Sequence, residues 1–165
     1  MKRTLLLSIA TAALAIVPAA FAETSTLGVT VAPEASFTTV AASTSLSKSD
    51  TTFGAYSGTT TFSYKIRSTQ TTGTGSIAVQ VSTFGTGGPA VSDLAYTCTA
   101  PSSGTPCSSS TAASTAAATS IVGFGADAHS ADSGDSGTAV WTLQDRTAIK
   151  TGDYTSTATF TISAT

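Results

Sequence analysis

Residues 154–163 read Tyr-Thr-Ser-Thr-Ala-Thr-Phe-Thr-Ile-Ser, and this stretch decides the fold class. Successive side chains of a β-strand point to opposite faces of the sheet, so alternation of apolar and polar residues predicts a strand that is buried on one face only. The apolar face carries Tyr154, Ala158, Phe160 and Ile162, and the hydroxyl face carries Thr155, Thr157, Thr159, Thr161 and Ser163. The pattern predicts a long strand at the edge of a hydrophobic core.

The same period of two recurs along the chain, and no segment after residue 22 keeps a helical period of 3.6. Further strands are predicted at residues 27–31, 62–66, 77–81, 94–98 and 139–143, with shorter candidates at 37–40 and 121–124. The alanine-rich stretch 112–118 is interrupted by Ser and Thr and is expected to be a loop. Seven to eight short strands separated by Gly-, Ser- and Pro-rich connections predict an all-β fold, an immunoglobulin-like antiparallel β-sandwich.

The first 22 residues have the three parts of a secretory signal peptide. Lys2 and Arg3 form a positive start, residues 5–17 are apolar, and small residues follow at the positions that signal peptidase reads. The apolar stretch is shorter than the roughly 20 residues that a membrane-spanning helix needs. The predicted cleavage-site residues are Ala20, Ala22 and Glu23. We therefore expect a signal peptide at 1–22, a single β-sandwich domain at 23–165, no membrane span after cleavage, and a secreted, periplasmic or cell-surface location in a bacterium.

The composition narrows the classes of partner. The chain contains 25 Ser and 34 Thr among 165 residues, and only 10% of its residues are charged. Without residues 1–22 it holds five basic and nine acidic residues, a net charge of −4. Nucleic acids and anionic membranes bind basic surfaces, which this chain cannot form, so neither is an expected partner. No cofactor is predicted.

Cys98 and Cys107 are the only cysteines and both lie in the exported part. An even number of cysteines in an oxidising compartment predicts a disulfide, here one that closes a ten-residue ring. The alternative is a redox-active pair, but such pairs usually have Cys-x-x-Cys spacing.

Residues 127–137 contain Asp127, Asp132 and Asp135 together with the only histidine, His129. Carboxylates in a flexible loop are calcium ligands, so these aspartates are a calcium candidate, although their spacing departs from that of an EF-hand loop. The alternative is a solvated connection, because Asp, Ser and Gly favour turns. The segment lacks the Gly-x-Ser-x-Gly turn of hydrolases. No metal site and no catalytic residue is predicted, and the chain is expected not to be an enzyme.

Regular rows of threonine, on the last strand and at Thr59 and Thr61, could bind ice or sugars if they formed a flat exposed face. Sugar sites usually add exposed aromatic side chains, and here the aromatic residues mostly have the inward phase. The alternative is that threonine simply favours β-strands and tolerates solvent.

The C-terminal third carries the motifs Ala-Val-Trp-Thr-Leu at 139–143, Lys-Thr-Gly-Asp-Tyr at 150–154 and Thr-Phe-Thr-Ile-Ser-Ala at 159–164. These motifs resemble the closing strands of uncharacterised secreted bacterial immunoglobulin-like proteins and, more distantly, of pilus and coat subunits. The resemblance covers about 30 residues and implies a two-sheet sandwich with a structural role at the cell surface. Chaperone–usher pilins and spore-coat-U-like domains usually carry a cysteine near the mature N-terminus, which this chain lacks.

Two function classes follow from these patterns. The first is a cell-surface structural protein, a filament or coat subunit whose segment 24–32, with Leu27, Val29 and Val31 on one face, completes the sheet of a neighbour. In that case the partner is a second copy or another surface protein. The alternative for this segment is that it forms the first strand of its own sandwich. The second class is a monomeric adhesin or carbohydrate-binding module that uses the loops 98–107 and 127–137.

Overall fold

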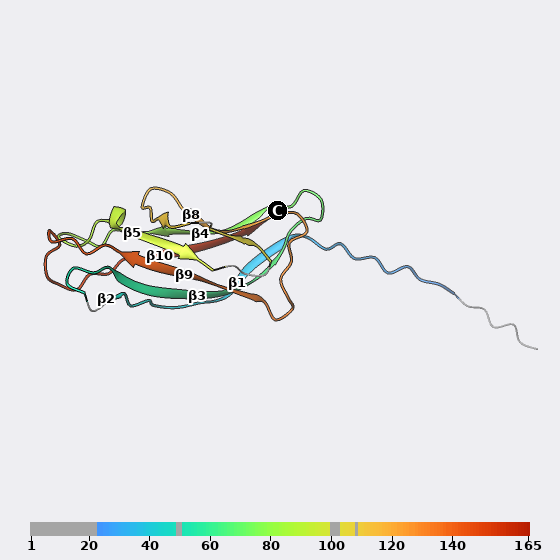
Figure 1. Ribbon diagram of the computed structural model, residues 1–165. Helices are drawn as coiled ribbons and strands as arrows, with labels where there is room; N and C mark the ends of the chain where they lie inside the picture. Colours follow the sequence, from blue (N-terminus) through green and yellow to red (C-terminus); the bar gives the residue numbers. More distant parts are fainter. Residues whose placement is uncertain (1–22, 49–50, 100–102, 108) are drawn as a thin grey trace, which may run out of the picture. The chain divides into compact units, whose positions relative to one another are not determined.

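The computed structural model describes residues 23–48, 51–99, 103–107 and 109–165 (Figure 1). These residues belong to two parts, one that ends at Thr30 and a compact part that comprises Val31–Thr165. The described residues of the first part, 23–30, have no regular secondary structure and are exposed to solvent. The predicted signal peptide, including Ala20 and Ala22, lies outside the described residues and remains a prediction.

The compact part is all-β, and its described residues include no α-helix, only the short 3-10 turn η1 at Val91–Asp93. Seven strands have five residues or more, and three strands have two residues each. The longer strands are β1 (Glu34–Val40), β3 (Tyr56–Arg67), β4 (Gly75–Val81), β5 (Leu94–Cys98), β8 (Thr119–Phe124), β9 (Asp135–Leu143) and β10 (Ala158–Ala164). The two-residue strands are β2 (Ser47–Lys48), β6 (Thr105–Pro106) and β7 (Thr111–Ala112).

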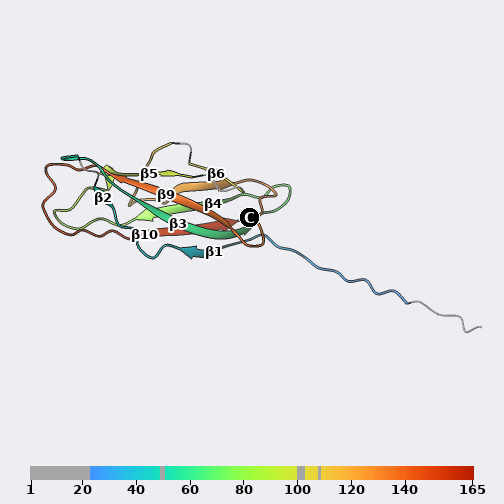
Figure 2. The ribbon, with the colours of Figure 1, turned by 60° about the horizontal axis from the view of Figure 1, so that its bottom comes forward.

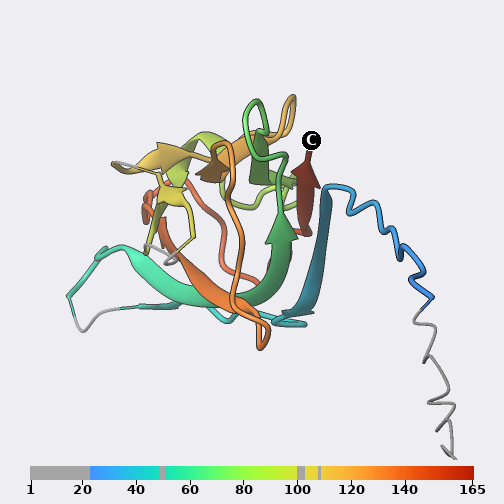
Figure 3. The ribbon, with the colours of Figure 1, turned by 90° about the vertical axis from the view of Figure 1, so that its right-hand side faces the viewer.

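The strands form two antiparallel sheets that face each other. The larger sheet has the order β1-β3-β9-β5-β7, with β2 also paired to β3, and the smaller sheet has the order β10-β4-β8-β6. Figure 3 views the compact part from one end and shows the two layers on either side of the core. Among the described strands, β1 and β10 are the long edge strands of the two sheets, and they lie next to each other (Figure 2).

The core lies between the sheets and is made of the inward phase of each strand. Along β3 the burial alternates through Thr60, Phe62, Tyr64 and Ile66, while the residues between them are exposed or half-buried. The apolar side chains of this core are Phe62, Tyr64, Ile66, Ile77, Val79, Val81, Leu94, Tyr96, Ala113, Ile121, Val122, Phe124, Ala139, Trp141 and Leu143. Side chains of two sheets that interdigitate in this way are the defining feature of a β-sandwich, and the predicted fold class is confirmed.

Most of the predicted strands are present. The strands expected at 62–66, 77–81, 94–98 and 139–143, the shorter candidates, and the C-terminal strand are all confirmed, although the last one begins at Ala158 rather than at Tyr154. Residues 112–118 contain no helix, as expected.

The exception is the segment at 27–31, which forms no strand. The larger sheet instead begins with β1, which starts directly after Pro33 and pairs with β3. The structure shows no strand in this segment, and its pairing, with its own sheet or with that of a neighbour, stays a prediction.

Within the described residues we find no helix with the length and apolar character required to traverse a lipid bilayer.

Candidate functional site

The N-terminal segment exposes the apolar residues that the sequence singled out. The exposed fractions are 95% for Leu27, 88% for Val29 and 59% for Val31. Glu23, the first residue after the predicted cleavage site, is exposed as well. Exposed apolar side chains that gather into a patch are a feature of interaction sites, so this segment is a candidate for one.

The chain is anchored where the compact part begins. The Nε–H group of Arg67, at the end of β3, donates a hydrogen bond of 3.0 Å to the carbonyl oxygen of Ala32. The same guanidinium forms an ion pair of 3.1 Å with the carboxylate of Glu34. These two contacts fix the direction in which the chain enters β1.

The side of the sandwich between β1 and β10 is incompletely covered. Inward-phase residues of these strands, such as Phe37, Phe160 and Ile162, pack against the core but are only half-buried. Ala158 has the same phase as Phe160 and Ile162, yet it is exposed. Residues on the corresponding phase of the central strands are buried, so the core lacks a cover along this side.

A cavity of about 880 Å³ opens at the end of this side where β1 finishes and β10 starts. One wall is the segment 40–46, and the other is the segment 149–158. The floor is apolar and consists of core side chains, namely Val81, Leu94, Trp141, Leu143 and Phe160. Aromatic residues stand around it, namely Phe53, Tyr56, Phe84 and Tyr154.

Trp141 is the only tryptophan of the chain, and hydrogen bonds fix its position in the cavity floor. Its indole Nε1–H donates to Oγ1 of Thr60 at 2.8 Å. Oγ1 of Thr60 lies 2.6 Å from Oγ1 of Thr44, which belongs to the cavity wall. Buried polar groups need such partners, and this chain of contacts ties the wall to the floor.

The opposite wall is held by contacts with the loop after β4. The Ser82 N–H group donates to the carbonyl oxygen of Thr157 at 2.9 Å, and the Thr157 N–H group donates to Oγ of Ser82 at 2.8 Å. The hydroxyl of Tyr154 donates to the carbonyl oxygen of Lys150 at 3.0 Å. The Tyr154 ring lies so close to Gly88 that a Cβ atom there would meet the ring at 2.6 Å. Both walls are therefore ordered without an occupant.

Two of the four charged residues that line the cavity, Asp145 and Arg146, form ion pairs with Lys48 and Asp93; the other two are Lys150 and Asp153. Lys48 Nζ lies 2.6 Å from Asp145 Oδ2, and the Arg146 guanidinium lies 2.9 Å from Asp93 Oδ1. The hydrogen bond to Asp145 raises the pKa of Lys48 above its usual value. The Lys48 ammonium also lies 5.4 Å from the ring centre of Phe53, whose backbone has a positive φ of 54°.

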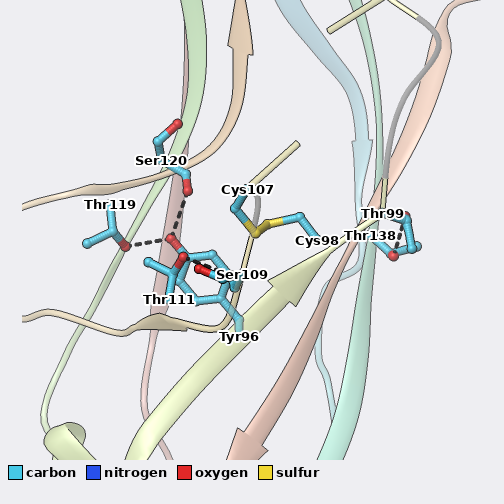
Figure 4. The surroundings of a disulfide bond; sticks show 9 residues. All are labelled: Tyr96, Cys98, Thr99, Cys107, Ser109, Thr111, Thr119, Ser120 and Thr138. Carbon is cyan, nitrogen blue, oxygen red and sulfur yellow. Dashed lines mark hydrogen bonds between the residues drawn. A yellow bond between two sulfur atoms is a disulfide. The ribbon is translucent and has the colours of Figure 1, made fainter. Parts of the chain in front are cut away.

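The predicted disulfide between Cys98 and Cys107 is present (Figure 4). Its Cα atoms are 5.5 Å apart, within the range that the bond requires. Cys98 ends β5 in the larger sheet, and Cys107 follows β6 in the smaller sheet, so the bond connects the two layers. Neither cysteine lines the cavity, and the bond serves to connect the two sheets.

Tyrosine hydroxyls make further connections between the layers near the disulfide. The Tyr96 hydroxyl lies 2.7 Å from Thr119 Oγ1 and 3.1 Å from the carbonyl oxygen of Ser120 (Figure 4). The Tyr64 hydroxyl lies 3.1 Å from Oγ of Ser103. Burial raises the pKa of both tyrosines above the usual value of 10.0, because the charged phenolate is poorly solvated there.

The calcium candidate is not assembled by the fold. Among the described residues, no group of three or more acidic, histidine or cysteine side chains is placed to hold a metal ion. Asp127 sits in a turn with a positive φ of 55°, and Asp135 begins β9, where its Oδ1 lies 3.5 Å from the Ala131 N–H nitrogen. His129 Nδ1 lies 2.8 Å from the carbonyl oxygen of Asp127. The loop thus has the geometry of a turn-rich connection.

Several hydroxyl groups on the outer sheet faces bond to each other across strands. Ser63 and Ser136 are joined at 3.0 Å, and Thr99 and Thr138 at 2.7 Å. Thr59 and Thr61 also face outward on β3. Cross-strand hydroxyl pairs of this kind stabilise a sheet, which favours a structural role for these residues.

Sequence reasoning did not find the cavity, because its walls come from segments without a strand pattern. One signal was present. Ala158 occupies an inward position of the longest alternating run but is much smaller than its neighbours Phe160 and Ile162. A small residue at such a position leaves space beside the core.

The chain was compared with protein-family models, with curated proteins and with solved structures, and no match was found in any of the three.

Proposed function

We propose that this protein is a non-enzymatic exported structural protein, a cell-surface filament or coat subunit that assembles through its N-terminal segment. The observation that carries the proposal is the exposure of Leu27, Val29 and Val31, three alternating apolar residues directly before the first strand. In the proposed mature chain this segment starts one residue after the new N-terminus.

Strand addition explains the pattern better than a flexible tail does. A disordered tail is usually rich in charge and poor in β-branched residues, whereas 24–32 has no charged residue and its three large apolar residues lie on one face of an extended chain. Burying a side chain of this size contributes roughly 1.5–3 kcal/mol. Main-chain hydrogen bonds to an exposed sheet edge supply the rest of the affinity in β-augmentation.

The proposal is tested with the mature chain and two variants. Replacing Leu27, Val29 and Val31 by serine keeps the length and removes the apolar face, and the matched control replaces Thr26 and Thr30 by serine on the other face. Size exclusion and negative-stain microscopy should show oligomers or filaments for the mature chain and the control but monomers for the triple variant. A mature chain that is monomeric at every concentration contradicts the proposal.

A second candidate is a monomeric module that binds glycans, and the aromatic residues around the cavity favour it. Phe53 is 56% exposed and Tyr154 stands on the opposite wall. Aromatic rings at an open site are typical of sugar binding. A glycan array with the mature chain tests this candidate, and the absence of any bound glycan would leave the assembly proposal alone.

A further inference from the structure

We infer that the cavity between the segments 40–46 and 149–158 is the acceptor for residues 24–32 of a second copy of the chain. The inference rests on the proposed function and identifies the place where the segment binds.

The cavity offers what an alternating strand needs. Its floor is apolar, and the exposed inward position of Ala158 marks where a covering side chain is missing. The edge strands β1 and β10 each pair with a single strand among the described residues, so their outer backbone groups can bond to an added strand. A volume of about 880 Å³ lies within the range of about 300–1,000 Å³ of pockets that enclose compact ligands, and it can hold several side chains.

The charges also fit a neutral segment. Residues 24–32 carry no charged side chain. The cavity lining holds two acidic and two basic residues, Asp145, Asp153, Arg146 and Lys150, so their charges balance. The Val, Leu and aromatic side chains of the floor offer few partners for the hydroxyl groups of a glycan, while the polar and charged groups, such as Ser43, Asp145 and Lys150, belong to the walls. The floor therefore favours an apolar strand over a sugar.

The positions of donor and acceptor predict the form of the assembly. The chain enters β1 at Glu34, which pairs with Arg67, whereas the cavity lies where Val40 pairs with Phe62. On β10 the cavity is likewise at the Ala158 end, away from the C-terminus. The compact part therefore begins at one end of the sandwich and is open at the other. A contact between two different surfaces is heterologous, and it propagates head to tail instead of closing a symmetric dimer.

Trp141 provides a direct measurement, because it is the only tryptophan and lies in the cavity floor. The full mature chain with Leu27, Val29 and Val31 replaced by serine serves as an acceptor that cannot donate. It is titrated with a synthetic peptide of residues 24–32, which contains no aromatic residue, while the tryptophan emission is recorded. We expect a saturable change in emission with this peptide and none with a peptide that has serine at the three apolar positions.

The location is tested by blocking the cavity from both walls. Ala158→Arg and Ala42→Arg each place a long charged side chain at the cavity, and the matched control Thr159→Arg places it on the opposite face of β10. We expect each cavity variant to weaken peptide binding at least tenfold and to stop filament growth, while Thr159→Arg does neither. Circular dichroism of all three variants shows which of them are folded. The two cavity variants lie on different walls, so either one tests the inference if the other does not fold.

The outcomes separate this inference from the proposed function. If the mature chain assembles and folded cavity variants assemble equally well, the acceptor is elsewhere and only the inference is wrong. If the mature chain stays monomeric and amides of 24–32 are protected from hydrogen exchange, the segment folds onto its own chain, and both the inference and the proposed function are wrong. If a saccharide changes the Trp141 emission and the peptide does not, the cavity is a sugar site and the inference is overturned.

Discussion

Replacing Thr60 by valine removes the acceptor of a buried hydrogen bond while it preserves the shape of the side chain. Trp141 Nε1 lies 2.8 Å from Thr60 Oγ1, and both residues are buried. In the variant the indole N–H group remains in apolar surroundings without its partner. A buried polar group left in this state costs about 1–3 kcal/mol. We therefore expect the free energy of unfolding to fall by about 2 kcal/mol, the middle of that range.

Two further variants separate the hydrogen bond from general effects of the substitution. Thr44→Val removes only the outer hydroxyl of the network and leaves the bond between Thr60 and Trp141, so it should cost about 0.5–1.5 kcal/mol. Trp141→Phe removes the donor itself. In that background Thr60→Val no longer leaves an indole N–H group without its acceptor and removes only the contact with Thr44. Its cost should therefore shrink by about 1–2 kcal/mol, a coupling typical of residues in contact.

Urea denaturation followed by far-UV circular dichroism measures all of these variants, including those without tryptophan. The reasoning is refuted if Thr60→Val is as stable as the parent within about 0.5 kcal/mol, the usual spread for neutral substitutions. It is also refuted if Thr60→Val costs the same with and without Trp141, because the loss would then not come from their hydrogen bond.

Three other perturbations have definite expected results. Reducing the disulfide should lower the free energy of unfolding by about 2.7 kcal/mol, from chain entropy for a ten-residue ring, as measured by denaturation with and without a reductant. The contribution of Tyr64 and Tyr96 to stability should be constant below pH 10 and fall as the pH rises further, because their raised pKa values mean that the unfolded chain loses its phenol protons first. Denaturation at pH 8 and pH 11 checks this, and an equal stability at both would contradict it. Gly137→Ala should destabilise the fold by about 1–3 kcal/mol through overpacking, because the added Cβ atom would meet the Phe62 ring at 2.6 Å. Gly123→Ala is the control and should be nearly neutral, since a Cβ atom there has no neighbour within 4 Å. Thermal melts of both variants measure the difference.

The alternation of side chains predicted most of the sandwich because burial on one face leaves a direct trace in the sequence. Phe62, Tyr64 and Ile66 are apolar where β3 faces the core, and residues with the opposite phase are hydroxyl-bearing or charged. The two cysteines likewise indicated their bond, since the chain has no other cysteine.

The segment at 27–31 shows the limit of such patterns. Its alternation predicts that one face is buried but does not say by what, and the strand that pairs with β3 is the less apolar stretch beginning at Glu34. The cavity escaped prediction for a related reason. It depends on how the irregular segments 40–46 and 149–158 are placed by hydrogen bonds between residues far apart in the chain, such as Thr44 with Thr60 and Thr157 with Ser82.

The cross-strand hydroxyl pairs on the outer faces have a consequence for the medium in which the protein can work. Only 10% of the residues are charged, and the described residues form three ion pairs, none of them buried in the core. Dissolved salt screens interactions between exposed charges but leaves contacts between neutral hydroxyls nearly unaffected. The sandwich should therefore keep nearly the same stability in fresh water and in brine.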